Sequence, residues 1–286
     1  MKSSAQASGP TAIIRAYNAL IRAGDLLGLT TPEVCPDRLR EQAERTTGLS
    51  HWGDSPFQAS LESVVRSAQE GRALTPMGRL ALRKMMRRSL VNKLLLEDLA
   101  RNAKEQFQVP VVRPVFIVGW YRSGTTLLHR LLAGMPGFRA PEAWELHFPV
   151  PGRTPAPVDR GLKLATTEAM LLLARQCVPN LDQVHSLRAR SAEESTLFLD
   201  NELCAVYAIH ALGAQEHGRW LLQQDLTHAY QSMKRQLQLL AGPTDPRRWV
   251  MKCPFSLWNL DTLLDVFPDA VVIRTHRAVT AALPSV

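Results

Sequence analysis

A glycine-rich loop between an apolar run and a helix-like segment limits what this chain can fold into. The run at residues 115–118 is continuously apolar, which is typical of a strand buried on both faces. Gly119 and Gly124 follow with four residues between them, and residues 125–133 then have the pattern of a helix. Backbone N–H groups at such a helix start can bind phosphate. The sequence therefore predicts a phosphate-binding loop at the end of a parallel strand.

The residue after the second glycine argues against the most common use of such a loop. A nucleoside triphosphatase has a lysine there to reach the β- and γ-phosphates, whereas this chain has Thr125. Arg122 lies inside the loop instead, where its guanidinium can bind an anion through two parallel hydrogen bonds. Ser123, Thr125 and Thr126 add three hydroxyl groups beside the flexible backbone of Gly124. We expect a loop that binds phosphate but does not serve a triphosphate.

The rest of the chain predicts an α/β fold with a parallel sheet. Short apolar runs at 249–251 and 270–273 indicate further buried strands. Strands that alternate with helices are typical of such a sheet. We divide the chain into a helical N-terminal extension, residues 1–108, and an α/β core, residues 109–286. Helices are expected within 11–107 and at 159–176, 191–211, 218–240 and 257–267.

Charge and composition limit the kinds of partner that this chain could bind, but they do not identify one. The formal net charge of +8 favours an anionic partner. The basic segment 83–88 has no interleaved aromatic residues, so it fits the solvated side of an amphipathic helix better than a nucleic-acid site.

The four cysteines lack metal-ligand spacing, and we expect no metal site. No run of about 18 uncharged apolar residues and no signal peptide are found, so we expect a cytoplasmic protein without a membrane span.

The loop also resembles a known family. Residues 114–119 and 122–128 are similar to the 5′-phosphosulfate loop of sulfotransferases that use 3′-phosphoadenosine 5′-phosphosulfate (PAPS) as the sulfuryl donor, in the bacterial branch that resembles tyrosylprotein sulfotransferases. The resemblance implies a P-loop three-layer sandwich, and a donor that has no γ-phosphate and needs no magnesium. The residues that it assigns to the donor are Arg122, Ser123, Gly124, Thr125, Thr126 and Leu127.

Two further segments resemble the same family. Lys252 ends an apolar run and is followed closely by Pro254, as is the family lysine that is implicated in stabilising the transferring sulfuryl group. Arg277 follows the run at 270–273, and Ser285 lies eight residues later. The pair resembles the arginine and serine that bind the 3′-phosphate. The family usually has Arg-Asp-Pro or Arg-Asp-Gly at this point, whereas Ala278 follows the arginine here.

Sulfuryl transfer to a hydroxyl needs a general base near the acceptor oxygen. In the branch that the chain resembles, an acidic residue about twenty positions after the loop arginine has this role. Glu142 lies at that distance from Arg122, and Glu145 would share a helix face with it. We keep both and favour Glu145, because it leads into a proline-rich loop that we expect to face the acceptor. His147 is a minor candidate.

These features together predict transfer of a sulfuryl group from PAPS to a hydroxyl or amine of a small-molecule or peptide acceptor. Family members usually continue beyond the 3′-phosphate serine, so we expect the C-terminal part of the core to be missing here. One alternative is a non-catalytic, degenerate nucleotide-binding remnant. A second is a P-loop kinase, which would need a lysine in the loop and a magnesium-binding acid after a strand.

Overall fold

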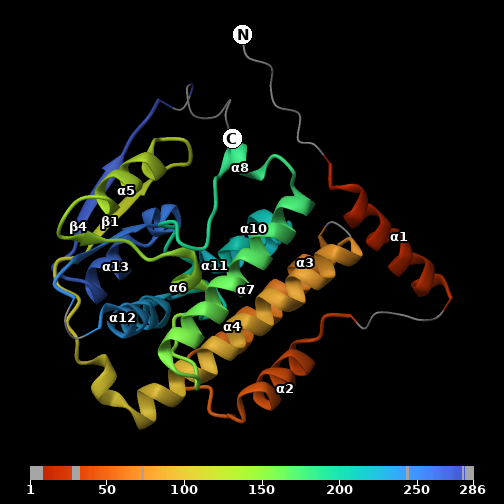
Figure 1. Ribbon diagram of the computed structural model, residues 1–286, viewed down its shortest axis with the longest axis horizontal. Helices are drawn as coiled ribbons and strands as arrows, with labels where there is room; N and C mark the ends of the chain where they lie inside the picture. Colours follow the sequence, from red (N-terminus) through yellow and green to blue (C-terminus); the bar gives the residue numbers. More distant parts are fainter. Residues whose placement is uncertain (1–8, 28–32, 72–73, 243–244, 279, 281–286) are drawn as a thin grey trace.

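The computed structural model of the chain describes residues 9–27, 33–71, 74–242, 245–278 and 280. Within these residues, a four-stranded parallel sheet has the order β2-β3-β1-β4. The strand β1, which leads into the glycine loop, is therefore an inner strand (Figure 1). Because parallel strands end at one edge of a sheet, the residues that follow them come close together there. The strands are β1 (Val115–Gly119), β2 (Phe138–Arg139), β3 (Arg248–Lys252) and β4 (Val271–Thr275).

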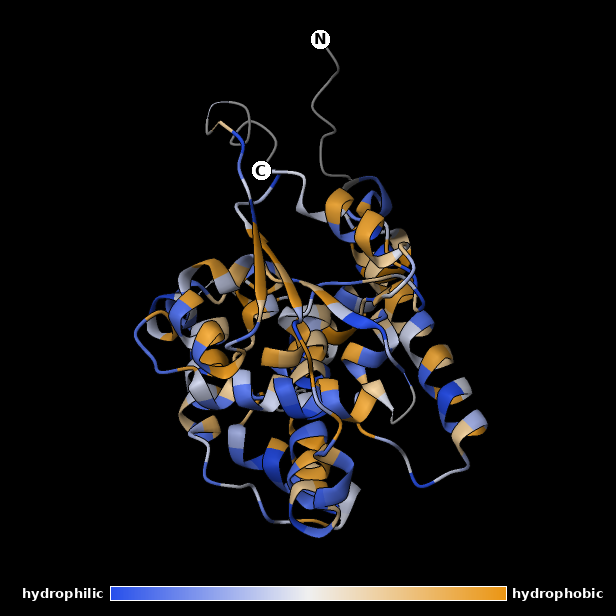
Figure 2. Cartoon of the chain, turned by 90° about the vertical axis from the view of Figure 1, so that its left-hand side faces the viewer, coloured by the Kyte–Doolittle hydropathy of each residue, from blue (hydrophilic) through white to orange (hydrophobic). Residues whose placement is uncertain are grey.

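Helices cover both faces of this sheet. On one face, α5 packs against Val115, Ile117 and Val250. On the other face, Phe116 and Met251 join an apolar cluster with α9, α12 and α13. The predicted three-layer α/β fold is confirmed, and the strands are hydrophobic ribbons in Figure 2. The core helices are α5 (Thr125–Ala133), α6 (Ala143–His147), α7 (Ala156–Cys177), α8 (Leu181–Val184), α9 (Thr196–Asp200), α10 (Val206–Ala211), α11 (Gln215–Leu221), α12 (Thr227–Ala241), η2 (Pro254–Trp258) and α13 (Leu260–Val266).

The N-terminal region is helical, as predicted. Its longest helix, α4, begins with Thr75 as N-cap, whose hydroxyl accepts a hydrogen bond from the Gly78 N–H at 3.1 Å. Helices α2, α3 and α4 share an apolar cluster with Leu203 and Ala208, so this region packs directly on the middle of the chain. The elements are α1 (Ala12–Leu26), α2 (Pro36–Thr47), α3 (Phe57–Glu70), α4 (Pro76–Asn102) and η1 (Lys104–Phe107).

Two of the predicted helices are broken in the structure. The expected helix at 191–211 begins with non-helical backbone, because the N–H of Glu193 donates to Pro141 O at 3.1 Å and that of Ser195 donates to Lys252 O at 3.0 Å. The expected helix at 218–240 is two helices, α11 and α12. Their periodicity is continuous, so the sequence hid the break. The expected helix at 257–267 begins only at Leu260, after the 3₁₀ turn η2. The two-residue strand β2 was not predicted.

Among the helices that the structure describes, none combines the length and apolar character that crossing a bilayer requires.

Candidate active site

The glycine loop follows β1, at the end of the sheet where the parallel strands have their carboxyl ends. Gly119 lies so close to β4 that a Cβ there would be 2.8 Å from the carbonyl oxygen of Thr275 and would clash with its hydroxyl. Gly124 has a left-handed backbone with φ of 91°, and Arg122 has φ of 64°, which is unfavourable for a residue with a side chain. The first-turn N–H groups of α5 have no intrahelical acceptors and are available to an anion. The predicted strand–loop–helix geometry is therefore present.

The loop is attached to the end of β4. The hydroxyl groups of Ser123 and Thr275 are 2.7 Å apart, and Ser123 also donates to Trp120 O at 2.5 Å. Arg277 Nη1 donates to Arg122 O at 3.2 Å, which brings the predicted 3′-phosphate arginine beside the predicted 5′ loop. Ser285 lies outside the described residues.

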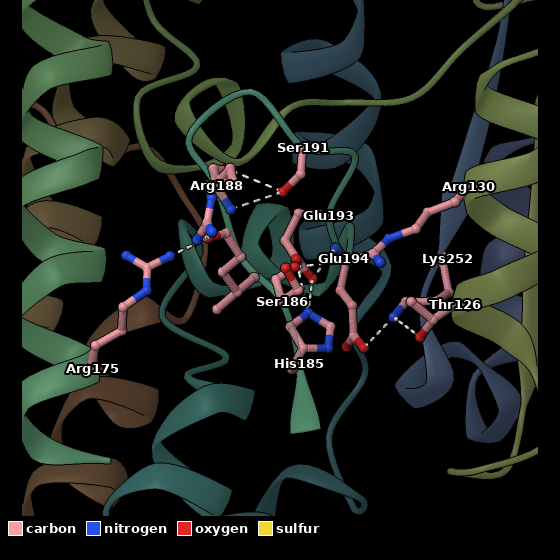
Figure 3. A network of polar contacts seen from close by, with 11 residues as sticks. Thr126, Arg130, Arg175, His185, Ser186, Arg188, Ser191, Glu193, Glu194 and Lys252 are labelled. Atoms are coloured by element: carbon pink, nitrogen blue, oxygen red, sulfur yellow. Dashed lines mark hydrogen bonds and ion pairs between the residues drawn. The ribbon is translucent and has the colours of Figure 1, made fainter. Parts of the chain in front are cut away.

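Lys252 lies at the end of β3 beside this loop. Its side chain is 2% exposed, so its ammonium group needs nearby compensation. Lys252 Nζ donates to Thr126 Oγ1 at 3.1 Å and is 2.5 Å from Glu194 Oε1 (Figure 3). The predicted lysine is thus in contact with the first turn of α5. Its carboxylate partner was not among the predicted site residues.

Glu193 and Glu194 form an acidic pair that sequence analysis missed. Glu193 is 3% exposed and contacts His185 Nε2 at 2.9 Å (Figure 3). Burial by itself would raise the pKa of Glu193, but the hydrogen bond from His185 and the charge of Lys252 outweigh it, so that pKa lies below its usual range. The only signal in the sequence was two adjacent acids in a segment that was expected to be helical.

The two predicted base candidates differ in their surroundings. Glu142 and Glu145 form a capping box at the start of α6, in which the Glu142 N–H donates to Glu145 Oε2 at 2.8 Å. Glu145 is 7% exposed and its other oxygen accepts from Arg139 at 2.8 Å. Burial raises the pKa of Glu145 although Arg139 opposes the shift. Glu142 is half-buried and accepts from the indole N–H of Trp144 at 2.5 Å.

The surroundings of His147, the minor candidate for the base, do not favour that role. Burial, followed by the charge of Arg88, places the pKa of His147 well below its usual range. Its backbone carbonyl accepts from Asn92 of α4 at 2.9 Å, and no contact within the described residues joins His147 to the loop or to Lys252. No cluster of three potential metal ligands occurs among the described residues.

Comparison with known proteins gives this geometry a family. The model of a sulfotransferase family matches residues 114–286, which include the loop, Lys252 and Arg277. The fold is similar to that of sulfotransferase STF1 from Mycobacterium tuberculosis H37Rv, with a TM-score of 0.73 and 31% identity over 87% of this chain and 69% of that one. It is also similar to sulfotransferase STF9 from Mycobacterium avium, with a TM-score of 0.68 and 26% identity over 84% of this chain and 62% of that one. No curated protein matches significantly. The chain belongs to the sulfotransferase family.

Proposed function

We propose that this protein transfers the sulfuryl group of PAPS to the hydroxyl of a small acceptor molecule. The observation that supports this most directly is the contact of Lys252 with Thr126, because it brings a buried ammonium group to the helix start where the loop would hold a 5′-phosphosulfate. As the acceptor oxygen bonds to sulfur, the bond from sulfur to the 5′-phosphate oxygen breaks. An ammonium group at this point stabilises the charge that develops on the leaving oxygen.

The other residues predicted to bind the donor lie in the loop, at the start of α5 or beside the loop, apart from Ser285, which is outside the described residues. The backbone around Gly124 and the side chains of Arg122 and Thr125 would bind the 5′-phosphosulfate, with Ser123 and Leu127 beside them. Arg277 would bind the 3′-phosphate, which distinguishes PAPS from other adenine nucleotides, and Ser285 is proposed to assist it. The hydrogen bond from Arg277 to the loop supports a single ligand that spans both segments.

Glu142 is the stronger of the two proposed bases. The carboxylates of both residues accept hydrogen bonds. Glu145 is 7% exposed and its bonds include one to the charged guanidinium of Arg139, whereas Glu142 is half-buried and accepts from the neutral N–H groups of the Trp144 indole and the Glu145 backbone. Glu142 lines a cavity beside β2 and could accept the proton of the acceptor hydroxyl. We therefore assign Glu145 to holding Glu142 in place. We expect Glu142→Gln to lower kcat with little change in the free energy of unfolding. Glu145→Gln should mainly lower the free energy of unfolding.

A binding comparison tests the donor assignment without needing the acceptor. We expect adenosine 3′,5′-bisphosphate to bind more tightly than ADP by calorimetry, with the same affinity in EDTA as in magnesium. A preference for ADP that requires magnesium would contradict the proposal and favour a P-loop kinase. Tight binding of the bisphosphate with no transfer to any acceptor would instead favour a non-catalytic remnant.

A further inference from the structure

A polar cavity beside β2 has not been given a ligand so far. Its volume is about 460 Å³, within the range of roughly 300–1,000 Å³ that is common for small-molecule sites. Residues of α5, of the segment between β2 and α6, of α7 and of the 190–192 stretch line it. Its lining contains the arginine side chains of Arg130, Arg139, Arg160, Arg190 and Arg247.

Two of these arginines are neutralised by the protein itself. Arg139 pairs with Glu145 at 2.8 Å and with Asp245 at 3.0 Å. Arg247 pairs with the same Asp245 at 2.8 Å. Two arginines and two carboxylates thus form a balanced cluster along one wall of the cavity, and it adds no net charge for a ligand.

The other three arginines have no carboxylate partner within the described residues. Arg130 donates to the backbone oxygen of Ser186 at 2.8 Å, which leaves its charge uncompensated. The guanidinium carbon of Arg160 lies 5.7 Å from the centre of the Trp144 ring, and Arg190 is exposed. Glu142 is the one remaining carboxylate in the cavity lining. The cavity therefore carries an excess of positive charge, which favours an anionic ligand.

Two of the residues that line the cavity belong to segments that also carry the proposed transfer site. Arg130 is one helical turn after Thr126 on α5, and Figure 3 shows it on the same side as Lys252. The backbone of Glu142 forms an isolated β-bridge with that of Ala192, which lies two residues before Glu194, the partner of Lys252. The proposed 3′-phosphate residues follow β4, at the opposite edge of the sheet from β2. A donor on the β4 side and an acceptor on the β2 side would meet at the end of β3.

We propose that the acceptor is a small hydroxyl compound with a second, anionic group such as a phosphate, sulfate or carboxylate. The anionic group binds Arg130, Arg160 and Arg190, and its hydroxyl lies between Glu142 and Lys252. This inference rests on the proposed function, since it assigns the acceptor of the same reaction. The arginines then give specificity by binding a part of the acceptor that does not react.

A pair of probes tests the inference by calorimetry, with adenosine 3′,5′-bisphosphate present at saturation so that the loop is occupied. The charged probe is 4-hydroxyphenyl phosphate, and the neutral probe is 4-methoxyphenol. We expect the wild-type protein to bind the charged probe at least about tenfold more tightly, since charge-assisted contacts to arginine are strong. The variant Arg160→Gln/Arg190→Gln should lose that preference. The matched control Arg38→Gln/Arg101→Gln, which removes the same charge from exposed positions on α2 and α4, should keep it.

Equal affinity for both probes in the wild-type protein would overturn the inference, and so would an unchanged preference in Arg160→Gln/Arg190→Gln. Failure of the proposed function is a separate result, because it would appear as absent binding of the bisphosphate. In that event the probes are compared in the Arg122→Ala variant without nucleotide, where the loop competes less for phosphate. The preference and its loss in Arg160→Gln/Arg190→Gln are still expected there.

Discussion

Among the residues that the structure describes, two lysines are buried, and they lie at two different kinds of place. Lys93 of α4 is 0% exposed and pairs with Glu202 at 2.8 Å, while Lys252 of β3 is 2% exposed and pairs with Glu194 at 2.5 Å. The partners differ more than the lysines do. The side chain of Glu202 is 1% exposed, whereas that of Glu194 is 19% exposed. Only the second pair reaches the open edge where the strands end, beside Thr126.

Burial and pairing of a charge therefore do not identify a functional residue by themselves. Lys93 lies over the ring of Phe57, with its nitrogen 5.5 Å from the ring centre, next to the apolar cluster of α2, α3 and α4. A substrate has no route to a charge that is enclosed in this way. Burying the ammonium group of Lys252 has a desolvation cost comparable to that of Lys93. A ligand on the loop, however, could replace Glu194 as the partner of Lys252. The first lysine should therefore matter for stability and the second for chemistry.

The largest expected effect is on the stability of the Lys93→Met variant. Removing one partner leaves Glu202 buried without its counter-charge, which costs about 3–5 kcal/mol of unfolding free energy. Urea unfolding measures the loss. The second substitution Glu202→Gln in the same chain should restore part of it. A Lys93→Met variant as stable as the wild type would end the contrast between the two lysines.

Lys252→Ala should act on the rate instead. An ammonium group that meets charge developing in the transition state contributes to the chemical step, so we expect kcat to fall by about 10²–10³. The affinity for adenosine 3′,5′-bisphosphate should change by less than about tenfold, whereas Arg277→Ala should mainly lower that affinity. If Lys252→Ala loses the nucleotide as badly as Arg277→Ala does, Lys252 is a ground-state phosphate ligand.

Arg122→Ala extends the contrast to the loop. Loss of a charge-assisted contact to phosphate should weaken bisphosphate binding by about 2–4 kcal/mol. Unfolding free energy should hardly change, because Arg122 is exposed and the loop is not part of an apolar cluster. Calorimetry with Arg101→Ala as the control separates the contact from the general loss of one positive charge. Unchanged affinity in a folded Arg122→Ala variant would contradict the loop assignment.

The smallest expected effect concerns His129, which is 1% exposed on α5. Burial, and then the charge of Lys252, lower its pKa to about 4. In the unfolded chain a histidine has a pKa of about 6.5, so as pH falls the unfolded state takes up this proton before the folded state does. His129 therefore does not oppose folding above about pH 6.5, and it lowers the free energy of unfolding as pH falls from there toward 4. In an NMR titration, Lys252→Met should raise the pKa of His129 and Lys93→Met should not. Equal pKa values in the two variants would remove the predicted coupling.

Much of the phosphate-binding part could be predicted from the sequence. The apolar run at 115–118 became β1 and the helix predicted at 125–133 became α5, because each pattern is local and continuous. The runs around 250 and 272 became β3 and β4 for the same reason. Parallel strands end at one edge, so these local predictions already implied that Lys252 and Arg277 would lie near the loop.

Which carboxylate lies beside Lys252 depends on contacts between segments that are far apart in the sequence. Glu194 is held there because the backbone at Ser195 bonds to the carbonyl of Lys252, 57 residues away along the chain. Long-range bonds of this kind also replaced the first turn of the helix expected at 191–211, where a backbone β-bridge joins Ala192 to Glu142. Periodicity records which faces of a segment are buried, but not which distant backbone satisfies its N–H groups. Those hydrogen bonds form only when the chain has folded, and they determine the acid that faces the lysine.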